Sequence, residues 1–150
     1  FEESAPYSRR CQELDPSFGP GNTDLARALE HVGRYEEALD YFRRGVTRPD
    51  GTVPPSTGLA IMLWRNDKRD EARRVMDEVL ERAKTAYIAP FGIASFHAVA
   101  GETAPALDWL ERAYADRDST MVFLKVHPRL DGLRGEPRFR TLLARMRLDD

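Results

Sequence analysis

The chain reads GRYEEALDYF at residues 33–42, and this stretch decides the fold. Glycine at position 33 suits the point where one helix ends and the next begins, because glycine adopts a positive φ without steric cost. Ala38 and Phe42 stand four residues apart, so a helix that follows the glycine carries both on one face. The stretch predicts a tight turn followed by a helix that buries one small and one large apolar residue.

The same pattern recurs along the chain with a period of 34 residues. Small residues at two helical positions let neighbouring helices approach to about 8–10 Å, and larger apolar residues at the others interlock between them. A fixed period of this length is typical of stacked helical units that bury their apolar faces against one another. The in-phase columns are Ala26, Ala60 and Ala94; Ala38, Ala72 and Ala106; Leu25, Leu59 and Ile93; Phe42, Met76 and Leu110; and Gly45, Val79 and Ala113.

These columns predict an all-α chain, an α-solenoid of antiparallel helix pairs wound into a right-handed superhelix. Gly33, Asp67 and Gly101 stand between the two helices of successive pairs. We expect a turn at residues 19–21, with Asn22 or Thr23 capping the helix that follows. The expected helices are 2–14, 23–32, 36–47, 56–65, 69–84, 89–100 and 103–116.

The period ends near residue 120, and a different kind of segment follows. Residues 121–126 are mostly apolar and are closed by Pro128. Pro137 opens a last helix at its first turn, where a missing N–H costs little. Since a solenoid needs a terminal element to shield its last repeat, we interpret this helix as a C-terminal cap.

The repeating pattern resembles that of the tetratricopeptide repeat family, most closely at residues 33–42. The resemblance implies a single domain over 1–150, made of a half repeat (1–18), three repeats (19–52, 53–86 and 87–120) and a capping segment (121–150). Residues 87–148 also resemble the closing segment of large bacterial repeat proteins, in which the repeats follow a signalling module. That implies a cytoplasmic segment of a bacterial regulatory protein, and Phe1 in place of an initiator Met fits a chain cut from something longer.

Composition narrows the range of functions. Apolar residues make up 41% and charged residues 32%, as in globular domains. No apolar run is long enough to span a bilayer, so no membrane role is expected. The net charge is −2, which argues against direct nucleic-acid binding, although residues 125–150 carry seven Lys and Arg against four Asp and Glu. We interpret that basic excess as the solvated face of a terminal helix.

Residues with catalytic or metal-binding chemistry form no recognisable pattern. The three histidines include no pair at i, i+3 or i+4, and His97 falls in a packing column. Cys11, the single cysteine, falls in the column of Gly45 and is expected to be buried. No phosphate-binding loop is present, because the glycines near residue 20 lack the lysine that such a loop requires. We therefore expect no enzyme activity, no cofactor and no metal.

In the family that the chain resembles, the first helix of each pair lines a groove that binds a peptide. The positions carried over as a partner-binding groove are Arg27, His31, Ile61, Trp64, Arg65, Ile88, Phe91 and Ser95. Some members of the family bind the C-terminal carboxylate of a peptide in this groove through several Lys, Asn and Arg residues. Of the matching positions here only Arg27 is cationic, so this carboxylate-binding mode is not expected. The alternative is that Ile61, Trp64 and Phe91 pack against neighbouring helices.

Two functions follow from these patterns. The first is a scaffold that holds a peptide or protein in the groove, with apolar anchors and some acidity in the partner. The second is a structural or self-associating spacer without a ligand of its own. A homodimer through the half repeat at 1–18 would cover the apolar face that its missing first helix leaves open.

Overall fold

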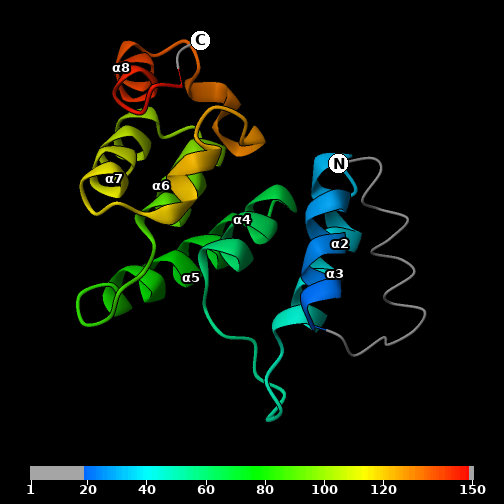
Figure 1. Cartoon of the computed structure of the whole chain (residues 1–150). Coiled ribbons are helices and arrows are strands. Elements are labelled where there is room, and N and C mark those ends of the chain that lie inside the picture. The colour runs from blue at the N-terminus through cyan, green and yellow to red at the C-terminus, as the bar shows by residue number, and fades with distance from the viewer. Residues whose placement is uncertain (1–18, 149–150) are drawn as a thin grey trace. The chain divides into compact units, whose positions relative to one another are not determined.

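The computed structural model describes residues 19–148, and every regular element in that range is helical (Figure 1). The chain divides into two compact units, one ending at Glu78 and the other beginning at Val79. The elements are α2 (Gly19–His31), α3 (Tyr35–Val46), α4 (Thr57–Arg65), α5 (Arg69–Arg82), α6 (Pro90–Val99), α7 (Thr103–Ala115), η1 (Ser119–Phe123), η2 (Pro128–Leu133) and α8 (Pro137–Arg145). The all-helical repeat fold is confirmed, while the right-handed superhelix and the single domain over 1–150 stay predictions.

The predicted helix boundaries agree with the structure to within two residues, except at the start of α2. That helix begins at Gly19, so the expected turn at 19–21 is wrong. Pro20 sits in the first turn, where its missing N–H costs little. Thr23 is not a cap, because its hydroxyl donates back to the carbonyl of Pro20 at 2.9 Å. The predicted helix at 2–14, Cys11 and the half repeat lie outside the described residues.

In the first unit, α2 and α3 form an antiparallel pair joined by a turn at Gly33, where φ is +80°. The start of α2 lies against the end of α3: a Cβ built on Gly19 would stand 2.8 Å from the carbonyl oxygen of Gly45. A Cβ on Gly45 would in turn stand 2.6 Å from the Thr23 methyl group. Glycine at both positions is what allows the two helices to approach so closely.

The next repeat packs on α3 in the same antiparallel manner. Asn66, which ends α4, donates from Nδ2 to the carbonyl of Tyr35 at the start of α3, at 2.8 Å. At the other end, a Cβ on Gly58 would meet the Phe42 ring at 2.6 Å. Ser56 caps α4 by accepting the N–H of Leu59 at 3.2 Å, as expected for serine at a helix N-terminus.

The second unit is built on the antiparallel pair α6 and α7, with η1, η2 and α8 completing its core.

Both alanine columns are fully buried throughout the repeats, with no exposed area at any of the six positions. Gly101 and Asp67, which were predicted to stand between the two helices of their pairs, have positive φ values of 78° and 56°. Among the described residues, no helix has the length and apolar character needed to cross a membrane.

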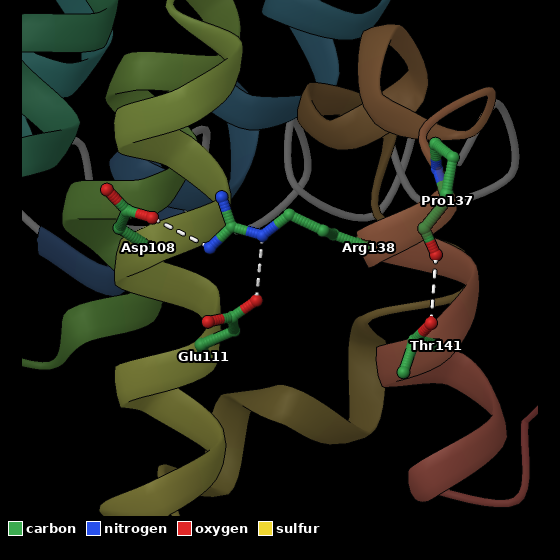
Figure 2. Close-up of polar contacts among 5 residues, drawn as sticks. All are labelled: Asp108, Glu111, Pro137, Arg138 and Thr141. Atoms are coloured by element: carbon green, nitrogen blue, oxygen red, sulfur yellow. Dashed lines mark hydrogen bonds and ion pairs between the residues drawn. The ribbon is translucent and has the colours of Figure 1, made fainter.

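Two polar residues join the elements of this second unit. Arg138 of α8 binds two carboxylates of α7, Asp108 at 2.7 Å and Glu111 at 2.9 Å (Figure 2). Those bonds raise the pKa of the guanidinium above its ordinary value. Asp118, after α7, accepts the N–H of Phe91 at 3.0 Å and so satisfies a free donor at the start of α6.

Candidate partner-binding surface

Three of the predicted groove residues are buried, so their expected exposure is wrong. Ile61 has no exposed area, and Phe91 and Ser95 are 4% and 2% exposed. Ile61 is buried because five consecutive residues of α4, 59–63, are all buried, so this part of the helix is covered on every side and presents no single apolar stripe. The alternative interpretation, packing against neighbouring helices, holds for Ile61 and Phe91.

In α6 the chain's own C-terminal segment covers the predicted groove positions. The Phe91 ring lies edge-on against His127, with ring centroids 5.4 Å apart, and His127 is the N-cap of η2. The Ser95 hydroxyl donates to the Phe91 carbonyl at 2.8 Å, within its own helix. Phe91 therefore belongs to the core of the second unit, and Ser95 is buried with its hydroxyl bonded within α6.

The two arginines of the predicted groove have carboxylate partners inside the first unit. Arg27 pairs with Asp24 one turn earlier on α2. Arg65 lies 3.8 Å from Glu30 and its guanidinium stands over the Tyr35 ring at 5.5 Å. Because the Glu30 side chain is only 9% exposed, the Arg65 contact ties α4 to α2 across successive repeats. The positive charges of Arg27 and Arg65, which were expected to face a ligand, are therefore paired with carboxylates of the same unit.

Trp64 lies on the last turn of α4 and is partly exposed. Two guanidinium groups from α5 stand by its ring, Arg69 at 4.8 Å and Arg73 at 4.9 Å from the ring centroid. Arg69 and Arg73 are four residues apart, so they leave the same face of α5. Cation–π contacts of this kind hold both the ring and the guanidiniums in defined positions.

The tryptophan and its two arginines form one surface within the first unit, which we call the Trp64 cluster (Trp64, Arg69 and Arg73). Both arginines are exposed, and Arg69 also pairs with Asp67 at 3.1 Å. A flat aromatic ring beside exposed guanidiniums can bury apolar area and bind a carboxylate or phosphate at the same time. No group of three His, Cys, Asp or Glu side chains that could hold a metal ion occurs between residues 19 and 148.

The remaining predicted positions lie apart from this cluster. His31 ends α2 and is exposed, while Ile88 is partly buried in the segment that precedes α6 in the second unit. The sequence-based reasoning missed Arg69 and Arg73 as site residues. One signal was present: Arg69 stands where Tyr35 stands in the first repeat, so a cation replaces an aromatic ring there.

Comparisons with known proteins identify the repeats. Two family models, both described as Tetratricopeptide repeat, match residues 23–54 and 57–120. Together they cover well over half of the chain, and the chain belongs to the tetratricopeptide repeat family. Such repeats generally mediate protein–protein interaction and are typically not enzymes. Searches among curated proteins and among solved structures gave no significant match.

Proposed function

We propose that this chain is a protein-interaction scaffold, without enzyme activity, that holds a peptide or protein segment at the Trp64 cluster. The observation that carries the proposal is the partly exposed Trp64 ring with two guanidiniums within 5 Å of its centroid. Tryptophan and arginine are among the residues most enriched where binding energy concentrates, and a tryptophan ring buries a large area for few frozen torsions.

The charge of the cluster favours a partner segment with an apolar anchor next to acidic or phosphorylated residues. Arg69 and Arg73 bring two positive charges to the Trp64 ring, and guanidinium groups pair with carboxylates and phosphates in a bidentate manner. Ile61 and Phe91 do not contribute to this surface, since both are buried. Arg27, His31, Arg65 and Ile88 stay candidate partner-binding residues, but they are not part of the Trp64 cluster.

The test uses peptides selected on the whole chain from a random displayed library, with affinities measured by fluorescence anisotropy. Trp64→Ala should weaken the selected acidic peptides by about 2 kcal/mol, a roughly thirtyfold loss. Arg73→Glu should weaken them further, whereas peptides selected without acidic residues should be less affected.

Trp109 supplies a matched control. It is the other tryptophan of the chain, it also carries a guanidinium over its ring (Arg112 at 5.0 Å), and it lies on α7 in the second unit. Trp109→Ala should leave the affinity of those peptides unchanged. A loss of stability of about 3–5 kcal/mol for Trp64→Ala would mean that Trp64 is a core residue. Peptide binding as tight as that of the wild type would mean that Trp64 is not the binding site, and either result refutes the proposal.

The alternative function is a structural or self-associating spacer. It predicts that no library peptide depends on Trp64 and that the chain sediments as a concentration-dependent dimer, for example through the half repeat at 1–18. The setting that we propose is a larger bacterial regulatory protein in the cytoplasm, with a protein partner and no direct contact with nucleic acid or membrane. The resemblance of residues 87–148 to the closing segments of such proteins supports that setting.

A further inference from the structure

The central repeat differs from its neighbours at the residue that follows its first helix. Gly33 and Gly101 stand at this place in the other repeats, with φ values of 80° and 78°, whereas Asp67 follows α4 with a φ of 56°. The backbone bonds are the same in all three turns: the N–H of the next residue donates to a carbonyl five residues earlier, at 2.9, 3.0 and 2.8 Å.

Neither the backbone nor the packing of this turn explains the aspartate. Glycine adopts the left-handed conformation without steric cost, while a residue with a Cβ is strained there. A Cβ built on Gly33 or Gly101 would meet no atom within 4 Å, so the equivalent side chain has nothing to pack against. The turn alone would therefore favour glycine at position 67.

The contacts of the Asp67 carboxylate lead to the Trp64 cluster. The carboxylate accepts a hydrogen bond from the Arg69 guanidinium at 3.1 Å, and the same guanidinium stands 4.8 Å from the centroid of the Trp64 ring. Position 69 is also special to this repeat, since Tyr35 and Thr103 are its in-phase residues. Asp67, Arg69 and Trp64 are thus joined by direct contacts within the first unit.

This ion pair contributes little to the stability of the fold, because the side chains of Asp67 and Arg69 are 86% and 58% exposed. Its effect on a partner is larger. An acidic group that binds Arg69 must displace the Asp67 carboxylate or lie beside its negative charge, and either one weakens binding. A neutral apolar group at the Trp64 ring meets no such opposition.

We propose that Asp67 is a specificity-determining residue of the Trp64 cluster. It holds the Arg69 guanidinium beside the ring and limits how strongly the cluster prefers acidic over neutral segments, so that the apolar anchor decides which segment binds. This inference rests on the function proposed above, because it concerns the partner of the same surface.

Substitutions of Asp67 in the whole chain test the inference, with the library peptides that lose affinity on Trp64→Ala. Asp67→Gly should bind the acidic peptides about threefold to tenfold more tightly at low salt, and the gain should shrink at high salt. Versions of these peptides with Gln and Asn in place of Glu and Asp should change by less than about twofold. The melting temperature should equal or exceed that of the wild type, because glycine suits the positive φ. A purely structural role would instead lower the melting temperature and affect both sets of peptides alike.

Asp77 supplies a matched control, since it is an exposed carboxylate about two turns after Arg69 on α5. Asp77→Asn and Asp67→Asn remove the same charge, but only Asp67→Asn should strengthen the acidic peptides by more than about twofold. NMR of the free protein gives a second measurement, because the ring current of Trp64 shifts the side-chain signals of Arg69. That shift should decrease in Asp67→Gly and stay unchanged in Asp77→Asn.

The outcomes separate this inference from the proposed function. If Trp64→Ala weakens the acidic peptides but Asp67→Gly does not strengthen them, the inference is overturned and the proposed function stands. If no selected peptide depends on Trp64, the proposed function fails and the inference fails with it. Arg69 signals that Asp67→Gly leaves unmoved also overturn the inference, because Asp67 then does not hold the guanidinium beside the ring.

Discussion

Replacing Asp118 by asparagine should destabilise the second unit by about 2 kcal/mol. The carboxylate is buried and accepts three hydrogen bonds, from the N–H of Phe91 on one oxygen and from Thr120 on the other. Asparagine keeps the shape of the side chain but turns one acceptor into an NH₂ donor. A buried N–H of Phe91 or Thr120 then faces another donor, and an unsatisfied buried donor costs about 1–3 kcal/mol.

The second unit contains one of the chain's two tryptophans, which makes this change measurable without interference from the first unit. In a Trp64→Phe background, Trp109 fluorescence reports unfolding of the second unit alone, since Trp109 packs against its core. A urea titration should show the midpoint moving down for Asp118→Asn. The thermal midpoint should fall by roughly 5–10 °C for a loss of this size.

Two neighbouring substitutions bracket the result. Thr120→Val removes only the hydroxyl bond and should cost about 1 kcal/mol. Asp116→Asn neutralises an exposed carboxylate that pairs with Arg112 at 3.5 Å, and should cost less than about 0.5 kcal/mol. If Asp118→Asn is no worse than Asp116→Asn, the start of α6 is not held by Asp118 and the reasoning is refuted.

Three further experiments test other contacts. Arg138→Met should lower the melting temperature at low salt, with the loss shrinking in 1 M NaCl, whereas Arg140→Met, which loses a bond to a backbone carbonyl, should show little salt dependence. Because the pKa of Arg138 is raised above its ordinary value, its contribution is fully present below that value, and the difference should be flat from pH 6 to 10. Gly45→Ala should cost about 1–3 kcal/mol in a urea titration because its Cβ meets backbone, while Gly132→Ala, with open space around it, should be neutral or slightly stabilising. The Asp50 carboxyl accepts hydrogen bonds from the N–H and the hydroxyl of Thr52, and these bonds lower its pKa. An NMR titration of Asp50 should show the lowered pKa. Any stabilisation from these bonds should be present above the ordinary pKa of aspartate and should be lost as the pH falls through the lowered pKa.

The repeat period was sufficient to predict the interior of the fold. Small residues recurring every 34 positions had to face a neighbouring helix, and all six alanines of the two columns are fully buried. The turns at Gly33 and Gly101 could also be predicted, because a positive φ between two helices is a local property of the chain. The start of α2 was misjudged since glycine and proline usually mark a turn, yet here Gly19 serves a close helix contact with Gly45.

The candidate site was less predictable because groove positions were carried over by column, without knowledge of what covers them. Ile61 and Trp64 are three residues apart on α4, but Ile61 is buried and only Trp64 reaches the surface. The contact between Phe91 and Asp118 spans 27 residues, so no local pattern could reveal it. The positions of the two guanidiniums beside Trp64 depend on how α5 packs against α4. The repeat period predicts that these helices pack together but not which side chains meet.

The segment after α7 shows why the third repeat departs from the expected groove. This repeat is followed by η1 and η2 in place of another helix pair, so these short helices cover its apolar face. Here η2 contacts α6, and His127 covers Phe91, the residue that the column assignment offered to a ligand. The short connection from α7 to η2 then runs as a 3₁₀ turn that buries Met121 and Leu124 and directs Val122 and Phe123 outward. The face of α6 that the column assignment offered to a ligand is therefore covered by the protein's own chain, which is why the repeat period alone could not locate an exposed binding surface there.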